Sequence, residues 1–98
     1  MKKNDTTREL TYKFAIRIIR MAKYLQEEKK EYILSKQVLK SGTAIGTLIR
    51  EGQYAESDAD FVHKLSSALK EANETEYWLS LLQETLFGAD SIMKNHKP

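Results

Sequence analysis

The 98-residue sequence contains no cysteine, and its single proline is the last residue. The absence of cysteine excludes disulfides and thiolate metal sites, a composition typical of cytoplasmic proteins. No apolar run is long enough to cross a membrane as a helix, and no apolar segment follows the short basic start as it would in a signal peptide. We therefore expect a cytoplasmic protein with one domain, residues 1–98, and no membrane partner.

Most of the sequence shows the periodicity of amphipathic helices. Apolar residues recur at spacings of three and four in three segments, and no stretch of useful length alternates as a strand does. In the first segment, Thr6 and Glu9 form a capping-box pattern ahead of an apolar stripe. The stripe consists of Leu10, Phe14, Ile18, Met21 and Leu25. The pattern predicts that a helix begins at Thr6.

The third segment carries the longest stripe. Ser57 is its predicted N-cap, and Asp58 and Asp60 follow in the first turn, where negative charge suits the helix dipole. Gly88 is expected to end this helix, and residues 89–98 have room for a short one. The stripe consists of Phe61, Leu65, Ala68, Ala72, Thr75, Leu79, Leu82 and Leu86. We predict an all-α fold, an antiparallel up-down helical bundle with three long helices and a truncated fourth.

The stretch SGTAIG, residues 41–46, looks at first like a phosphate-binding loop. Such a loop follows a strand and ends in Gly-Lys-Ser or Gly-Lys-Thr, whereas Thr47 and Leu48 follow Gly46. We predict instead that residues 32–54 form one helix and that a neighbouring helix, the first or the third, approaches closely at Gly42 and Gly46. Mid-helix glycines destabilise a helix, so close packing is the expected compensation. A local kink or hinge is the alternative.

Positive charge is concentrated in the first half of the chain. Residues 1–50 carry 12 Lys/Arg against 5 Asp/Glu, a balance of +7, and residues 51–98 carry 4 against 9, a balance of −5. In the second helix Lys36, Lys40 and Arg50 fall on one line with Thr43, Thr47 and Tyr54, opposite the apolar stripe. This line suits a nucleic-acid backbone. An ordinary solvated helix face is the alternative.

The first helix adds two further candidate surfaces. Lys13, Arg17 and Arg20 flank its apolar stripe, and together with the cations of the second helix they are expected to form a basic nucleic-acid-binding surface. Tyr12, Ile16 and Ile19 lie off the centre of the stripe and are candidates for an oligomer interface. Scattered exposed apolar residues, which are common on protein surfaces, are the alternative.

Catalytic and metal sites have no support in the sequence. Di-metal helical bundles use Glu-x-x-His pairs, which do not occur here, and no nucleophile is accompanied by a base in a recognisable motif. Glu71, Glu74 and Glu76 are acidic residues of the third helix, and Glu76 is expected to pair with Arg17 or Arg50. We expect no enzyme activity, no cofactor, no metal and no small-molecule substrate.

Two stretches, LKSGTAIGTLIRE and DADFVHKLSSALKEANETEYWLSLL, resemble the four-helix-bundle family of bacterial 23S rRNA intervening sequences. The family is related to the accessory variability protein of diversity-generating retroelements. The resemblance covers about residues 10–82 and implies a small up-down bundle that forms oligomers. In the retroelement branch it further implies binding to nucleic acid and to a reverse transcriptase. Family members carry a full fourth helix, for which this sequence leaves little room.

The sequence therefore predicts a non-catalytic, homo-oligomeric helical bundle that binds RNA or DNA electrostatically through the basic faces of its first two helices. The alternative is a protein-interaction scaffold. In that case the apolar surface of the first helix and an open groove would receive a partner helix, for instance from a reverse-transcriptase-like protein.

Overall fold

The computed structural model describes residues 2–87, with side chains for residues 6–86. Three α-helices follow one another, α1 (Lys2–Glu27), α2 (Leu34–Gln53) and α3 (Asp58–Leu82), and a π-helical turn, η1 (Gln83–Phe87), continues α3. No strand occurs within residues 2–87, and the all-α prediction is confirmed. Gly88 and the short helix expected for residues 89–98 lie outside the described residues.

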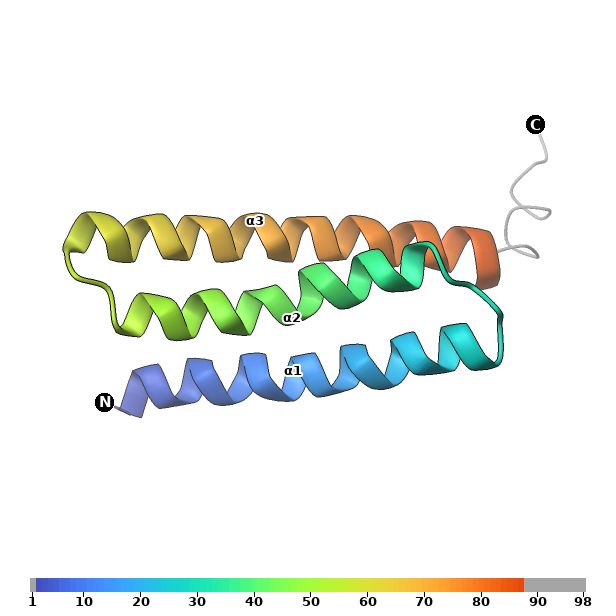
Figure 1. The fold of residues 1–98 in the computed structure, drawn as a ribbon, viewed down its shortest axis with the longest axis horizontal. Helices are drawn as coiled ribbons and strands as arrows, with labels where there is room; N and C mark the ends of the chain where they lie inside the picture. The colour runs from blue at the N-terminus through green and yellow to red at the C-terminus, as the bar shows by residue number, and fades with distance from the viewer. Residues whose placement is uncertain (1, 88–98) are drawn as a thin grey trace, which may run out of the picture.

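The three helices lie side by side, and the chain reverses direction at each connection (Figure 1). The central helix α2 packs against both α1 and α3. In the described part of the chain, no Cα atom of α1 lies within 8 Å of a Cα atom of α3. The two outer helices therefore meet only through side chains, which leaves a groove between them.

The start of α1 differs from the prediction. The helix begins at Lys2 rather than at Thr6, so Thr6 and Glu9 lie inside it and the predicted capping box is wrong. No proline or glycine precedes Thr6, and nothing in the local sequence stops the helix from extending by another turn. A little further on, the Thr11 hydroxyl donates to the Thr7 carbonyl oxygen at 2.9 Å, within the same helix.

The small residues of SGTAIG lie in the middle of α2, which is helical from Leu34 to Gln53 without interruption. At Gly42 a Cβ atom would stand 3.0 Å from two side-chain carbons of Ile18, which is itself buried. At Gly46 it would stand 3.4 Å from the Thr11 hydroxyl oxygen. The single helix and the close approach are both confirmed, and α1 is the helix that packs here.

The N-termini of α2 and α3 are stabilised in different ways. The Glu31 carboxylate accepts hydrogen bonds from the backbone N–H groups of Ile33, Leu34 and Ser35 at 3.2, 2.9 and 2.7 Å. These are donors that a helix leaves without an intrahelical partner, and negative charge there suits the helix dipole. At α3 the predicted cap is confirmed, because the Ser57 hydroxyl accepts from the Asp60 N–H at 3.1 Å.

The core runs along the inner side of α2. Its buried cluster comprises Ile18 and Leu25 of α1, Val38 of α2 and Leu82 of α3. One buried hydrogen bond crosses from α3 to α2, donated by the Thr75 hydroxyl to the Ser41 hydroxyl oxygen at 2.8 Å. Because an unpaired hydroxyl is costly to bury, this bond favours one register between the two helices.

The predicted stripe of α3 is only partly buried. Ala68, Thr75 and Leu82 are buried, whereas Phe61 and Leu65 remain exposed. A single neighbouring helix covers a narrow strip of another helix, and the stripe of α3 is wider than α2 can cover. The first two residues of the stripe, Phe61 and Leu65, are therefore left uncovered by the chain itself.

Candidate nucleic-acid interface

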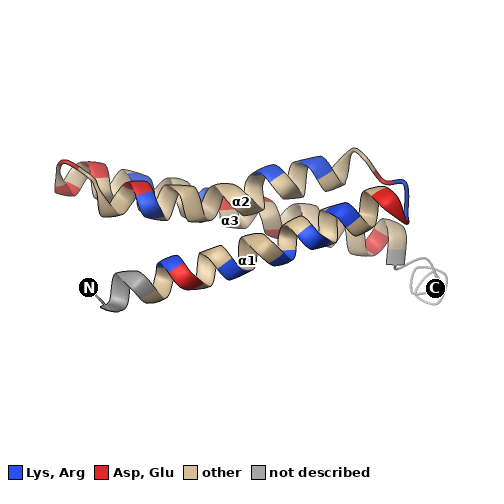
Figure 2. Ribbon diagram, turned by 60° about the horizontal axis from the view of Figure 1, so that its bottom comes forward, with Lys and Arg blue, Asp and Glu red and all other residues tan. Residues whose placement is uncertain are grey.

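The outer face of α2 carries the predicted line of cations. Lys36, Lys40 and Arg50 are exposed, between about 120° and 160° around the helix from the buried Val38. Figure 2 shows that Lys and Arg residues are distributed along α1 and α2, while acidic residues gather mainly near the two ends of the molecule. The structure therefore places the three predicted cations of α2 on one solvent-facing line.

These cations have no acidic partner in the described part of the chain. Ion pairs of the described residues join Lys13 to Glu9 at 3.8 Å and Lys64 to Glu51 at 3.0 Å. Neither pair involves the cations of α2 or Arg17 and Arg20 of α1. Glu76 is also in neither pair, so its predicted pairing with Arg17 or Arg50 is wrong. Glu76 is exposed on α3, where water solvates its carboxylate. A cation without a carboxylate partner remains available to an external anion.

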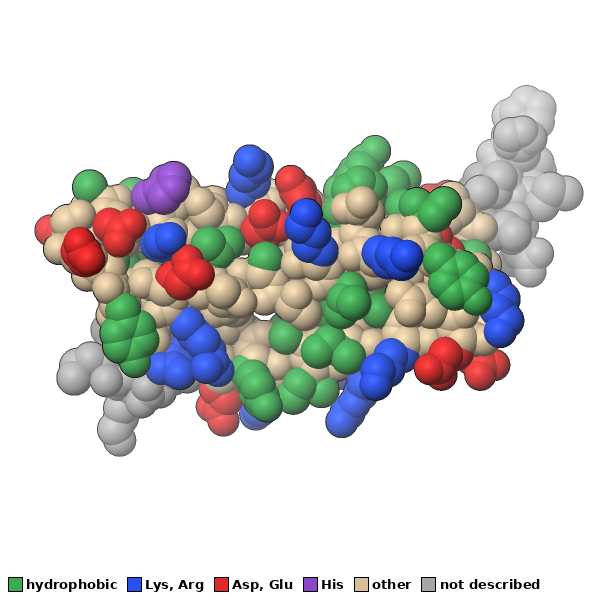
Figure 3. All heavy atoms as spheres, in the orientation of Figure 1, with side chains coloured by type: hydrophobic (Ala, Val, Ile, Leu, Met, Phe, Trp, Pro, Cys, Tyr) green, Lys and Arg blue, Asp and Glu red, His purple; other side chains and the backbone are tan. Residues whose placement is uncertain are grey.

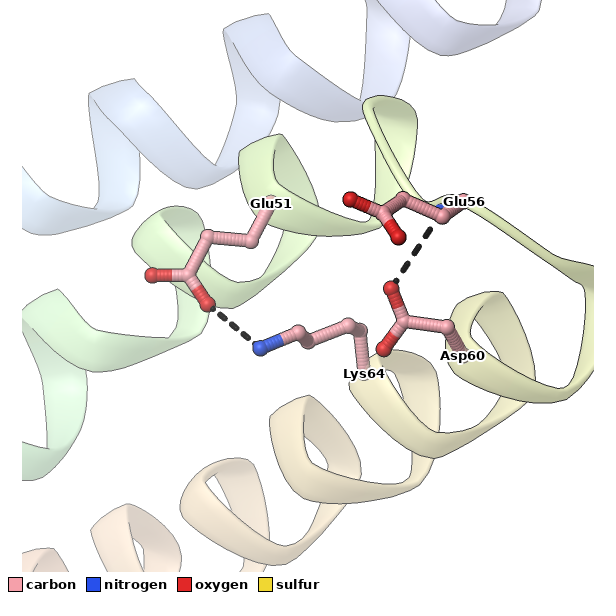
Figure 4. Close-up of polar contacts among 4 residues, drawn as sticks. All are labelled: Glu51, Glu56, Asp60 and Lys64. Carbon is pink, nitrogen blue, oxygen red and sulfur yellow. Dashed lines mark hydrogen bonds and ion pairs between the residues drawn. The ribbon is translucent and has the colours of Figure 1, made fainter.

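The shorter ion pair, between Lys64 and Glu51, lies near the connection between α2 and α3. Lys64 Nζ donates to Glu51 Oε1, and this hydrogen bond, with the charges of Glu51 and Asp60, raises the pKa of Lys64 above its usual 10.5 (Figure 4). The pair's contribution to stability is fully present below pH 10.5 and is lost as pH rises through the raised pKa. Lys64 therefore holds two helices together and adds little positive charge for a ligand.

The three cations of α1 form a separate cluster. Lys13, Arg17 and Arg20 line a shallow surface groove of about 540 Å³ together with three apolar residues of the same helix, Leu10, Phe14 and Ile16. Tyr12 lies on the side of α1 that faces Arg50. Measured around the helix axis from Tyr12, the three cations are displaced by about 80° to 140°. The structure does not unite the six predicted cations in one surface. It forms two clusters, one on α1 and one on α2.

The residues predicted for an oligomer interface lie between these clusters. Ile19 is 39 % exposed, and the half-buried Ile16 lines the groove of the α1 cations. Tyr12 is exposed, and the Arg50 guanidinium carbon lies 5.8 Å from the centre of its ring. Figure 3 shows hydrophobic and basic side chains interspersed along α1 and α2 on one face of the molecule.

A second apolar surface, which the sequence did not predict in detail, lies between α1 and α3. Near the ends of these helices it forms a groove of about 400 Å³, lined by Met21, Tyr24, Leu25, Leu79, Leu82 and Gln83. On α3 exposed apolar side chains continue away from the groove, with Leu69 64 % exposed. The others on α3 are Phe61, Val62, Leu65 and Tyr77. Phe61 and Leu65 belong to the apolar stripe of α3, which was the signal in the sequence, whereas Val62 and Leu69 lie beside it.

Other kinds of site find no support in the part of the chain that the structure describes. No three His, Asp or Glu side chains come together there as metal ligands. None of its helices is long and apolar enough to span a membrane. Trp78 packs half-buried against the core cluster rather than on the surface.

The fold and its charged outer faces define a small all-α protein whose exposed surface is basic on two helices and apolar between the outer two. The chain belongs to the 23S rRNA-intervening sequence protein family, whose model matches residues 3–97. It is similar to a protein of unknown function from the S23 ribosomal protein family of Bacteroides thetaiotaomicron, known from a crystal structure. The two are 52 % identical with a TM-score of 0.84, over 87 % of this chain and 76 % of the other. No curated protein has a matching sequence.

Proposed function

We propose that this protein is a non-catalytic, oligomeric helical protein that binds RNA or DNA through the basic surfaces of α1 and α2. The observation that carries the proposal is the outer line of α2, where Lys36, Lys40 and Arg50 are exposed and belong to no ion pair of the described residues. Phosphate groups are the anions that such a line of cations fits best. The α1 cluster of Lys13, Arg17 and Arg20 offers a second, separate contact.

Charge rather than hydrogen bonding from hydroxyls is expected to dominate this binding. Thr43 donates its hydroxyl proton to the Leu39 carbonyl oxygen at 2.8 Å, and Thr47 donates to the Thr43 carbonyl oxygen at 3.5 Å. Both hydroxyl groups are thus engaged with their own helix, which leaves the cations as the donors to phosphate. Binding led by charge has a weak sequence preference and a strong dependence on salt.

The dependence on salt tests the proposal. If Lys36, Lys40 and Arg50 each neutralise one phosphate, the affinity for a structured RNA is expected to fall about 40-fold from about 50 to about 200 mM salt, because each contact contributes a slope of about −0.9. Fluorescence anisotropy with a labelled RNA hairpin measures this directly. An affinity that stays constant over the same range would rule out the electrostatic mechanism.

The apolar groove between α1 and α3 favours a second candidate function, that of a scaffold receiving a partner helix. Exposed Leu69 and Leu65 on α3, and Tyr24 at the groove itself, give such a helix an apolar surface. Helices commonly bind other proteins by inserting an apolar face into a groove of this kind. A reverse-transcriptase-like protein is the partner that the relation to the retroelement proteins suggests.

Measurements of molar mass in variants show which of the two apolar surfaces joins copies of the protein. If copies associate through the outer side of α1, Ile19→Glu is expected to reduce the mass in light scattering to that of a monomer, because it places a charge in the interface. Leu69→Glu, a matched change on α3, would then leave the mass unchanged. The reverse result would assign self-association to the exposed apolar face of α3, and a monomeric wild type would contradict the oligomer proposal.

A further inference from the structure

Two exposed tyrosines flank the last cation of the α2 line. Tyr12 of α1 is 57 % exposed, and the Arg50 guanidinium carbon lies 5.8 Å from the centre of its ring. Tyr54 follows Arg50 by four residues, about one helical turn, at the end of α2 and is 77 % exposed. Both rings are accessible to an outside ligand, and Tyr12 adjoins a guanidinium that no carboxylate of the described residues neutralises.

Between Tyr12 and Arg50 the surface is hollowed. A groove of about 280 Å³ runs between the two helices, lined by Thr11, Tyr12 and Ala15 of α1 and by Thr43, Gly46, Thr47 and Arg50 of α2. Gly46 and Ala15 lie at the bottom of the groove, where their small size leaves space for a ligand. The groove is therefore bordered by the flat ring of Tyr12 on one side and by the Arg50 guanidinium on the other.

The hydroxyl groups that line this groove can still accept hydrogen bonds. Thr11 and Thr43 donate their protons to carbonyl oxygens of their own helices, at 2.9 and 2.8 Å. Each hydroxyl oxygen keeps lone pairs for an outside donor. The groove thus offers acceptors on its sides and a donor fork from Arg50, which together suit the edge of a nucleobase with its amino and carbonyl groups.

We propose that this groove binds an unpaired base of a single-stranded nucleic acid, which stacks on Tyr12 or the Arg50 guanidinium plane, while a neighbouring base of the same strand stacks on Tyr54 at the end of α2. The proposal rests on the proposed function and names its ligand. In a duplex the faces of each base are covered by neighbouring bases, so only an unpaired base can stack on a side chain. Lys40 lies ten residues before Arg50, about 15 Å along α2, where it meets the phosphates of the same strand.

The test compares two forms of one RNA, an unstructured single strand and the same strand paired with its complement, by fluorescence anisotropy at one salt concentration. The wild type is expected to bind the single strand more tightly. Replacement of both rings, Tyr12→Ala with Tyr54→Ala, is expected to weaken single-strand binding about tenfold or more and to change duplex binding by less than about twofold. Tyr12→Phe with Tyr54→Phe, which keeps the rings, is expected to restore the preference.

Tyr77→Ala supplies the matched control, because Tyr77 is also an exposed tyrosine but lies on α3. Equal losses for single strand and duplex in the double alanine variant would overturn the base-binding site, since the rings would then only support Arg50. Wild-type binding without preference for the single strand would also overturn it, while the proposed function would stand. If the wild type bound neither form, both would fail.

Discussion

Gly42→Leu is expected to lower the free energy of unfolding by about 2 kcal/mol, since overpacking in a core costs about 1–3 kcal/mol and the gain in helix propensity is below about 1 kcal/mol. At this position a Cβ atom alone would stand 3.0 Å from two carbons of Ile18, and leucine adds three more carbons beyond it. Ile18 is 3 % exposed and branched at Cβ, so it has little freedom to move aside. A loss of this size lowers the melting temperature by about 8–16 °C.

Gly52→Leu supplies the comparison for thermal unfolding followed by circular dichroism. Gly52 is also buried, but the atom nearest to a Cβ there is 3.5 Å away, on Lys64, which is an ordinary van der Waals contact. Gly52→Leu is therefore expected to cost less than the same change at Gly42, and Gly46→Leu to cost an intermediate amount because Thr11 stands at 3.4 Å. An unchanged melting temperature for Gly42→Leu would mean that α1 does not pack against this glycine.

Charge reversal on the outer line of α2 is expected to have the largest effect on binding. The triple variant Lys36→Glu, Lys40→Glu and Arg50→Glu is expected to reduce affinity for RNA at least about 100-fold at low salt, because three attractive phosphate contacts become repulsive. The fold should persist, since the three side chains are exposed and form no ion pair within residues 2–87. Circular dichroism checks the fold, and fluorescence anisotropy measures the affinity.

The matching variant on α1 is Lys13→Glu, Arg17→Glu and Arg20→Glu, which changes charge by the same amount. Because these cations lie around the helix from Tyr12 and Arg50, their reversal is expected to reduce affinity by a smaller factor. A loss of binding in the α1 variant alone would place the nucleic acid on α1 and contradict the role of the α2 line.

Features encoded by neighbouring residues were predictable from the sequence. The helical spacing between residues 34 and 53, the failure of SGTAIG to match a phosphate loop and the Ser57 cap all depend on residues within a turn or two of each other. The cap formed by Glu31 is equally local. It was not predicted because a glutamate in the preceding loop is not one of the standard capping patterns. The capping box at Thr6 failed because the pattern marks a possible start without excluding an earlier one.

The arrangement of the candidate site depended on how the helices are rotated against each other. The spacing of Lys13, Arg17 and Arg20 places them on one side of α1, but it does not say which side α2 covers. That is fixed by the contact of Ile18 with Gly42 and of Thr11 with Gly46. These contacts turn the α1 cations away from those of α2 and bring Tyr12 to Arg50 instead. Likewise, the sequence predicts an apolar face on α3, but it does not predict how much of that face the chain itself buries.

The slope of log affinity against log salt concentration, compared between the wild type and a neutralised variant, tests the central claim most directly. The variant is Lys36→Gln, Lys40→Gln and Arg50→Gln, which removes charge without adding repulsion. If these three cations contact phosphates, its slope is expected to be shallower than that of the wild type by about 2 to 3, close to one for each contact removed. Identical slopes for the two proteins would show that the outer line of α2 does not bind nucleic acid.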